Sequence, residues 1–303
     1  MEKENISVHS TKKLVKANYY FVNERFSRQL ISDVVIVEQP LQITLSWHQA
    51  AKIKSNVFAI TMRTPGNEQA LIIGLLISEG IINNLAEIEC IDADATNNNQ
   101  WIVQLSEGTV PELASLERYQ MTYSSCGLCG STSLNALELK KPLRLTQTQQ
   151  KFEFPVSQIS RLASEMRHQQ VLFSQTGGVH GAALFDQQAN LLHVFEDIGR
   201  HNAVDKVIGH YLLTQKANHK TTKSTLVKHE QVNELLILVV SGRISFEIVQ
   251  KALMAGFSIL VGVGAASDLA IQAAQRFDMT LIGFVSEQGF NVYHGDWRLT
   301  NHN

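Results

Sequence analysis

The chain has 303 residues, of which 44% are apolar and 18% are charged, so it can bury one large core or two modest ones. Its formal net charge of -2 excludes a general electrostatic attraction to nucleic acids or anionic membranes. The longest apolar runs are too short to span a bilayer, and the N-terminus has no apolar block followed by a cleavage site. We therefore expect a cytoplasmic protein with neither membrane nor nucleic-acid partners.

The first part of the chain has the pattern of a small α+β domain. Residues 1–30 are polar and predict an extended or poorly ordered arm, with regular structure beginning after it. Asn67 can cap a helix over residues 68–80, which ends at Gly80 and is apolar almost all round, so it should be deeply buried. Strands are expected over residues 33–39, 41–48 (after a turn at Pro40), 56–63, 87–94 and 101–108.

The pattern changes after Pro155. Ser157 can cap a helix in which Ile159, Leu162, Ala163 and Met166 recur at helical spacing. A hairpin is expected next at residues 181–196, then a helix at 199–213 and a lysine-rich stretch that looks solvated at 215–230. Three apolar strands follow at residues 234–240, 257–263 and 279–285, with helical patterns between them. Alternating apolar strands and helices predict a parallel sheet covered by helices. We thus expect an arm at 1–30, an α+β domain at 31–135 that ends in a cysteine loop, and an α/β domain at 136–303.

Two of the three cysteines, Cys126 and Cys129, stand in the segment SSCGLCGST. Four readings are open: half of a metal site, a redox pair, a carrier of a reactive group, or two small residues at a tight turn. Zinc needs three or four protein ligands, and the sequence has neither a second C-x-x-C nor a zinc-type histidine motif, so no metal is expected. The flanking glycines favour a thiolate that reaches more than one partner, such as a persulfide carrier that Cys129 could resolve.

Four glycine-rich segments fall at strand ends, at residues 176–183, 196–206, 240–247 and 262–268. The ends of parallel strands and the helices that follow them form a natural anion site. Arg200, His201 and Arg243 lie in these segments and can bind phosphate. Together the segments predict a nucleotide or pyrophosphate ligand at one sheet edge, although glycines at strand ends can also serve turn geometry alone.

Six segments in order resemble the formate dehydrogenase accessory sulfurtransferase family, the FdhD proteins: MRTPGNEQALIIGLLISEGII, SSCGLCG, TGGVHGAALF, EDIGRHNAVDKVIG, SGRISFEIVQKALMAG and LIGFVSEQGFNVY. The resemblance runs from about residue 30 to the C-terminus. It implies a cytidine-deaminase-like fold for the C-terminal domain and a homodimeric sulfur carrier in the cytoplasm. Such a carrier takes sulfur from a cysteine desulfurase and passes it to the molybdenum cofactor, as bis(molybdopterin guanine dinucleotide), before insertion into formate dehydrogenase.

The resemblance also implies the site residues. Cys126 would bear the persulfide, and Cys129 would assist it. The family's cofactor-contacting turn falls, after the last expected strand, on Phe284, Val285, Ser286, Glu287, Gln288 and Gly289. Many members have basic residues in this turn, whereas this chain has the acidic Glu287. The lysine-rich stretch at residues 215–230 looks like an insertion that should be mobile and lie outside the site.

Two rival functions remain. The first is a non-catalytic chaperone that binds the cofactor and formate dehydrogenase and uses the cysteines only structurally. The second is a zinc hydrolase of the deaminase type, which the implied fold suggests. Against the hydrolase stand the missing H-x-E motif and Ser125, where such enzymes have a proline before the first cysteine.

Overall fold

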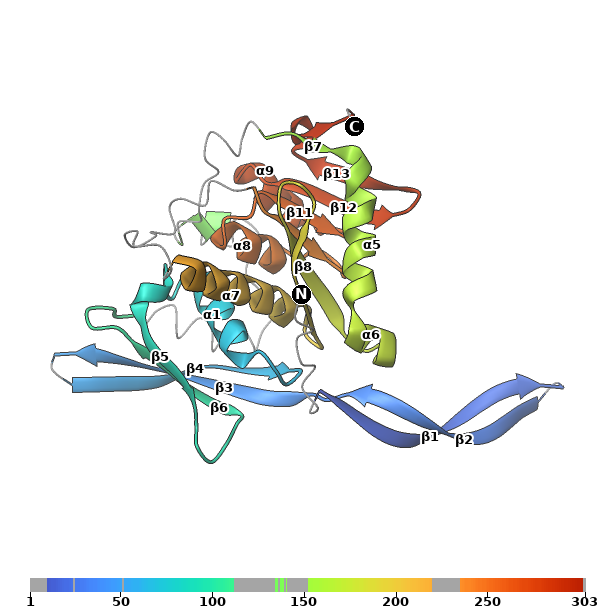
Figure 1. Ribbon diagram of the computed structural model, residues 1–303, viewed down its shortest axis with the longest axis horizontal. Helices are drawn as coiled ribbons and strands as arrows, with labels where there is room; N and C mark the ends of the chain where they lie inside the picture. The colour runs from blue at the N-terminus through green and yellow to red at the C-terminus, as the bar shows by residue number, and fades with distance from the viewer. Residues whose placement is uncertain are drawn as a thin grey trace.

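The computed structural model is shown in Figure 1. It describes residues 10–23, 25–50, 52–111, 134–135, 137–138, 140, 152–219 and 235–301. Within these residues, every helix is too short or too polar to cross a bilayer.

The N-terminal segment is a long antiparallel ribbon rather than a loosely ordered arm. β1 (Thr11–Val22) pairs along its whole length with β2 (Arg25–Ile36). Asn23 in the connecting turn has φ 49°, a left-handed conformation that asparagine tolerates in tight hairpins. The prediction that structure begins after residue 30 is therefore wrong, because polar residues on both faces of the ribbon obscure its strand pattern.

The next sheet has four strands in the order β4-β3-β6-β5: β3 (Gln39–Gln49), β4 (Lys52–Arg63), β5 (Ile88–Ala93) and β6 (Gln100–Leu105). The predicted turn at Pro40 is wrong, since Pro40 lies inside β3 and β2 does not pair with β3. Proline lacks a backbone N–H, and it is tolerated here because β6 pairs with β3 only from Gln42 onward.

Helix α1 (Glu68–Ser78) covers the inner face of this sheet and is buried from Ala70 to Ser78. Its apolar character all round is explained by its place between this sheet and α7 (Arg200–His219). Gly80 follows the helix with φ 70°, as expected for a C-terminal glycine. Asn67 occupies the N-cap position, but its side chain makes no capping bond; instead Glu68 accepts a bond of 2.8 Å from the backbone N–H of Gly66.

The second large sheet has six strands in the order β13-β12-β11-β10-β8-β9. Its strands are β8 (His180–Phe185), β9 (Leu191–Asp197), β10 (Ile237–Val240), β11 (Ile259–Gly262), β12 (Thr280–Ser286) and β13 (Gly289–His294). The predicted parallel core is confirmed, because β10, β11 and β12 run parallel. The sheet is mixed overall, since β8, β9 and β13 add antiparallel pairs. β13 was not predicted.

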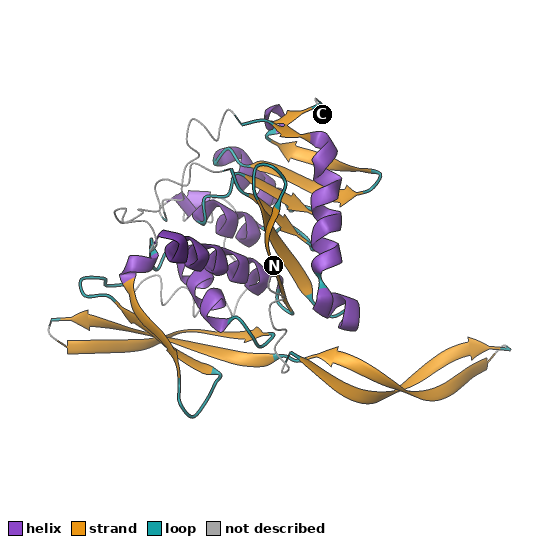
Figure 2. Ribbon diagram, in the orientation of Figure 1, coloured by secondary structure: helices purple, strands orange, loops and turns teal. Residues whose placement is uncertain are grey.

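Helices cover both faces of the six-stranded sheet (Figure 2). α5 (Ile159–Gln169) and α6 (Val171–Thr176) follow the short turn η2 (Val156–Gln158), and α5 packs on one face. α7, α8 (Phe246–Met254) and α9 (Asp268–Arg276) pack on the other. Ser157 lies inside η2 and does not cap α5, but the predicted core positions Ile159, Leu162, Ala163 and Met166 are all buried.

The remaining elements are short: η1 (Leu85–Glu87), β7 (Phe154–Pro155), η4 (Asp296–Arg298) and β14 (Leu299–Thr300). α7 continues to His219, into the stretch expected to be an excursion, and residues 220–230 of that stretch lie outside the described residues. The α/β class is confirmed, and the cytidine-deaminase-like arrangement stays a prediction.

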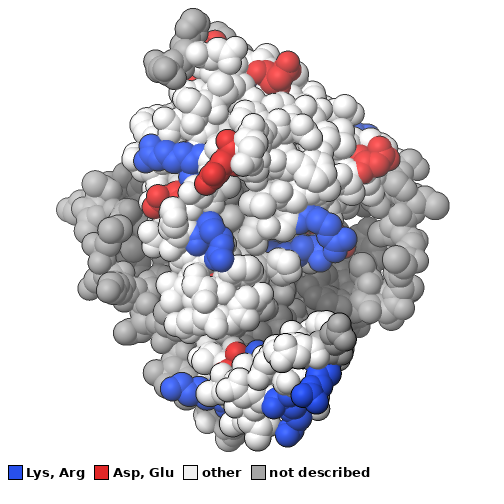
Figure 3. All heavy atoms as spheres, turned by 90° about the vertical axis from the view of Figure 1, so that its right-hand side faces the viewer, with Lys and Arg blue, Asp and Glu red and all other residues white. Residues whose placement is uncertain are grey.

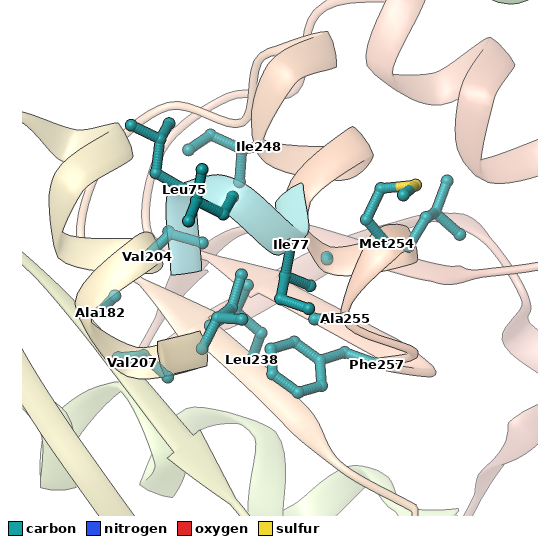
Figure 4. Packing of buried hydrophobic residues seen from close by; sticks show 14 of the residues in the cluster. Leu75, Ile77, Ala182, Val204, Val207, Leu238, Ile248, Met254, Ala255 and Phe257 are labelled. Atoms are coloured by element: carbon teal, nitrogen blue, oxygen red, sulfur yellow. The ribbon is translucent and has the colours of Figure 1, made fainter. Parts of the chain in front are cut away.

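The core of the molecule joins the two sheets through α1 and α7. A single cluster contains Leu75 and Ile77 of α1, Val204 of α7, and Leu238 of β10 (Figure 4). α1 and α7 cross so closely that a methyl group added at Gly74 would lie 1.9 Å from the carbonyl oxygen of Asp205. The predicted domain boundary near residue 135 stays a prediction. Residues from both sides of it pack into one hydrophobic cluster.

Candidate functional site at the strand ends

The four glycine-rich segments meet at one edge of the six-stranded sheet, as predicted. β10 and β11 end at this edge, β8 begins there and β9 ends there. The backbone N–H of Gly181 donates to Ser241 Oγ and that of Ser241 donates to the Gly181 carbonyl, each at 2.9 Å. The N–H of Gly264 donates to the Gly242 carbonyl at 3.1 Å. The segments after β10 and β11 are thus bonded directly to each other and to the start of β8.

Glycine allows close contact where these segments touch, and it is required at Gly264. A Cβ at Gly264 would lie 2.9 Å from the backbone nitrogen of Arg243, so a side chain there would force the two loops apart. A Cβ at Gly242 would lie 3.3 Å from Nδ1 of His180. Close backbone approach leaves the edge without side-chain bulk, which suits a ligand that contacts the main chain.

Basic side chains surround this edge. His180 begins β8, Arg200 and His201 begin α7, and the exposed Arg243 follows β10. Burial and the nearby charges of Arg200, His201 and Arg243 lower the pKa of His180, so its ring is neutral near pH 7. Figure 3 faces this side of the molecule, where basic and acidic side chains are interspersed.

Two interactions refine this charge distribution. His201 Nε2 lies 2.9 Å from Glu247 Oε2, and the hydrogen bond to His201 lowers the pKa of Glu247. Nε of Arg200 is buried and has no hydrogen-bond partner among the described residues. A buried donor without an acceptor is costly, so the Arg200 guanidinium favours an anionic ligand at this edge.

A buried ion pair holds the start of α7 in place. Lys206 Nζ lies 2.7 Å from Asp197 Oδ2, and both side chains are almost wholly buried. Asp197 also accepts bonds from the backbone N–H groups of Thr64 and Gly199 and from Asn202 Nδ2. Because Thr64 follows β4, this network ties the first sheet to the glycine turn that precedes Arg200.

The six C-terminal residues expected to form one turn are divided between two strands. Phe284, Val285 and Ser286 end β12, and Gly289 begins β13, so only Glu287 and Gln288 form the turn. The turn therefore does not follow the last strand. The N–H of Phe284 donates to the Gly264 carbonyl at 3.1 Å, and Phe284 has φ 55°.

This placement divides the six residues by their distance from the strand-end site. Phe284 is bonded to the Gly264 segment and lies at the rim of the site, half exposed. Ser286 lies toward α5, since its carbonyl accepts a bond from Ser160. Glu287 and Gln288 are exposed at the hairpin tip.

Comparison with known proteins shows the family of this chain. The FdhD/NarQ family model matches residues 36–300. The chain belongs to the FdhD/NarQ family. It is 36% identical to the "Sulfur carrier protein FdhD" of Streptomyces avermitilis, over 88% of this chain and 89% of the relative. It is 37% identical to the protein of the same name from Saccharolobus solfataricus, over 86% and 89% of the two chains.

A solved structure shares the fold of this FdhD/NarQ member. A crystal structure described as a formate dehydrogenase accessory protein from Desulfotalea psychrophila aligns with a TM-score of 0.64. The alignment covers 95% of this chain and 99% of the other, at 22% sequence identity. The family model and the curated relatives confirm, at the level of the family, the resemblance inferred from six sequence motifs, and the solved structure shows the fold.

The cysteine motif of this FdhD/NarQ chain, with Cys126 and Cys129, lies outside the described residues. Downstream of it, Leu134 and Leu137 are buried in the core, and Glu138 pairs with Arg276 at 2.7 Å. Arg276 is the last residue of α9, the helix that connects β11 to β12. It therefore lies at the edge of the sheet where the parallel strands begin. The described downstream flank of the motif is therefore anchored at the edge opposite the basic site.

Sequence reasoning missed two features of the site. The first is the Asp197–Lys206 pair, because nothing in the spacing of the two residues marks them as buried partners. The second is Thr64, which contributes from the turn after the distant strand β4 and whose segment RTPG carries no local signal for this contact. Among the described residues, no group of three or more His, Cys, Asp or Glu side chains is placed to hold a metal ion.

Proposed function

We propose that this chain is a sulfur carrier that delivers sulfur to a molybdenum cofactor for formate dehydrogenase. The observation that carries the proposal is family membership over residues 36–300 together with the name that curated relatives bear, sulfur carrier protein. The basic strand-end site supports it, because the cofactor in its guanine dinucleotide form carries pyrophosphate groups. The proposal places a homodimer in the cytoplasm with a cysteine desulfurase as sulfur donor.

Sulfur uptake in this proposal is a thiol exchange at Cys126. The Cys126 thiolate attacks the outer sulfur of the desulfurase persulfide, the S–S bond of that persulfide breaks, and the desulfurase thiolate leaves. For delivery, the Cys129 thiolate attacks the inner sulfur of the Cys126 persulfide. A Cys126–Cys129 disulfide forms, and the outer sulfur leaves as sulfide to the cofactor. Two equivalents of a cellular thiol then reduce the Cys126–Cys129 disulfide by successive exchange and become a disulfide themselves.

The third cysteine is poorly suited to the same chemistry. Cys90 is exposed on β5. A hydrogen bond to Asp92 raises the pKa of its thiol, and the negative charges of Asp92 and Glu89 act in the same direction. A thiol held in its protonated form is a weak nucleophile, so this environment favours the motif cysteines over Cys90 as the carrier.

The strand-end site fits the guanine nucleotide part of the cargo. Backbone approach at Gly242 and Gly264 admits a phosphate group, and Arg200 and Arg243 supply charge-assisted donors. Within the predicted cofactor turn, Phe284 at the rim would contact the base or ribose, and its position beside the Gly264 segment supports this part of the proposal. Glu287 lies at the exposed hairpin tip, where its charge does not oppose phosphate binding at the strand ends.

The test of the carrier function is direct. The purified chain is incubated with a cysteine desulfurase and cysteine, and the peptide that contains Cys126 is examined by mass spectrometry. We expect this peptide to gain the mass of one sulfur atom, and expect Cys126→Ala to lose both the adduct and formate dehydrogenase maturation. An unmodified peptide, with full formate dehydrogenase activity in the Cys126→Ala strain, would favour the chaperone function instead.

The cargo site has its own prediction. Replacing Arg243 by glutamine should weaken GDP binding by about 10- to 100-fold, because a charge-assisted hydrogen bond contributes about 1.5–3 kcal/mol. Isothermal titration calorimetry measures the affinity. Arg161→Gln is the matched control, since Arg161 lies on α5 and bonds only Gln158 among the described residues. Equal affinity of Arg243→Gln and the wild-type chain would place the nucleotide elsewhere.

A further inference from the structure

A cavity lies where the base of the N-terminal ribbon, β1 and β2, meets the four-stranded sheet (Figure 1). Its volume is about 780 Å³, and sites for small molecules commonly have volumes of about 300–1,000 Å³. It is lined by the ribbon base, the start of β3, the end of β4 with the turn that follows, the first residue of α1, and the hairpin between β5 and β6. Segments that are far apart in the chain therefore enclose one space.

This cavity is separate from the strand-end site. Arg63 and Pro65 line the cavity, whereas Thr64, which stands between them in the chain, does not. Thr64 instead belongs to the strand-end network. Its backbone N–H donates to Asp197 at 3.1 Å, and its hydroxyl accepts a bond of 3.0 Å from the N–H of Ile198. The basic residues of the strand ends are not part of the cavity lining.

The wall of the cavity contains a buried cation, Arg63, which is only 2% exposed. One of its terminal nitrogens lies 3.1 Å from Glu68, whose carboxylate also accepts a bond of 2.8 Å from the N–H of Gly66. Nε of Arg63 is buried and has no hydrogen-bond partner among the described residues. A buried donor without an acceptor is costly, and an acceptor atom of a ligand is the kind of group that this donor lacks.

The same guanidinium fixes the orientation of two side-chain amides. Arg63 Nη2 donates to Asn99 Oδ1 at 3.1 Å, and Nη1 lies 3.5 Å from Gln39 Oε1. A guanidinium has only donors, so both amides must turn their oxygen atoms toward Arg63 and keep their NH2 groups for other partners. Within the described part of the chain these two NH2 groups, and the side chain of the exposed Asn98, make no hydrogen bond. The lining is therefore rich in donors.

The charge of the lining is positive. Of the residues that line the cavity, Lys12 and Arg63 are basic and Glu68 is acidic. Because Glu68 is paired with Arg63, the exposed Lys12 supplies the remaining charge. Glu68 is also the first residue of α1, so the positive end of the helix dipole borders the cavity. Free donors and a net positive charge together favour an anion.

Trp101 gives the cavity an aromatic wall. It lies on the inner face of β6, because the alternate residues Val103 and Leu105 are buried in the core. The ring packs partly against that core, and its indole N–H donates to the Asn98 carbonyl at 3.1 Å. The polar group of Trp101 is thus already bonded within the protein, so this side chain offers a ligand its apolar ring.

We propose that this cavity binds a small organic anion in which a carboxylate or phosphate group is joined to a flat ring. The acidic group accepts hydrogen bonds from the NH2 groups of Gln39 and Asn99 and is attracted by Lys12, while the ring packs on Trp101. An inorganic anion alone would leave most of the volume unfilled. An uncharged ring alone would leave the donors without acceptors.

The first test measures binding of two probes, phenyl phosphate and benzoate, to the full chain by saturation-transfer NMR. At least one probe should bind with a dissociation constant of about 1 mM or lower, a reasonable affinity for a ligand of this size. It should bind at least about 10-fold more tightly than inorganic phosphate, acetate or phenol, because it satisfies both parts of the cavity. The preferred probe identifies the acidic group. If neither probe binds, or neither exceeds those smaller molecules, the proposal is wrong.

Charge reversal at the exposed part of the lining locates the anion. Lys12→Glu/Asn98→Asp should weaken binding of the preferred probe by about 10-fold or more, because two carboxylates then repel it. Both positions are exposed, so the fold should be unaffected. Lys13→Glu/Asn97→Asp makes the same charge change at neighbouring exposed residues outside the lining and should weaken binding less than about 3-fold. Equal losses in the two variants would mean that the probe is not held in the cavity.

Two further comparisons locate the ring and exclude the strand-end site. Trp101→Leu should weaken binding of the preferred probe by about 5-fold or more, and Trp101→Phe, which keeps a ring, should restore most of it. Arg243→Gln alters the strand-end site and should leave this binding unchanged. If the folded Trp101→Leu variant binds the probe as the wild-type chain does, or if Arg243→Gln abolishes binding, the probe lies elsewhere and the proposal is overturned.

Discussion

Replacing Lys206 by methionine is expected to lower the free energy of unfolding by about 3–5 kcal/mol, because it leaves the buried carboxylate of Asp197 without its counter-ion. The change also removes the bond from Lys206 Nζ to the Thr64 carbonyl, 3.0 Å long. Methionine fills most of the space, so the loss reports charge and hydrogen bonding rather than a cavity. Urea unfolding followed by tryptophan fluorescence measures it.

Two further variants separate the buried charge from general effects on α7. Lys216→Met makes the same change at an exposed position of the same helix and should cost less than about 0.5 kcal/mol. Adding Asp197→Asn to Lys206→Met removes the unpaired charge and should restore part of the stability. If Lys206→Met unfolds like the wild-type chain, the pair does not hold the start of α7.

The parts of the fold that the sequence predicted are those with a strong local signal. The strands around residues 234–240 and 257–263 are continuous apolar runs between amphipathic helices, and only a parallel arrangement buries them. β1 lacks such a signal. Its polar side chains are exposed on both faces because the ribbon has no core beneath it, so alternation alone did not distinguish it from an irregular arm.

The residues of the site that come directly after strands were predictable from the sequence. Glycines at 242 and 264 and the basic residues Arg200 and Arg243 come directly after strands, and topology alone brings them to one edge. The pairing of Asp197 with Lys206 depends on how α7 packs against the turn at Thr64, a contact between residues more than 130 positions apart in the chain. No local pattern carries that information.

Gly74→Ala is the second variant expected to have a large effect, because it acts where α1 crosses α7. The added Cβ would lie 1.9 Å from the carbonyl oxygen of Asp205, which belongs to the helix backbone and cannot rotate away. The helices must therefore separate. Overpacking of a core costs about 1–3 kcal/mol, and we expect about 3 kcal/mol here, since backbone rather than a side chain must move. Thermal and urea unfolding measure the loss.

The crossing also predicts how Gly74 couples to Gly209. A Cβ at Gly209 would lie 1.9 Å from the carbonyl oxygen of Ala70, so Gly209→Ala should destabilise to a similar extent. The double variant should lose less than the sum, because helices already separated by one methyl group accommodate the second. Gly178→Ala is the control, since its Cβ would meet nothing closer than Ile36 at 3.5 Å. If the losses in the free energy of unfolding were fully additive, the two glycines would act at independent contacts. The contact between α1 and α7 would then not behave as one interface.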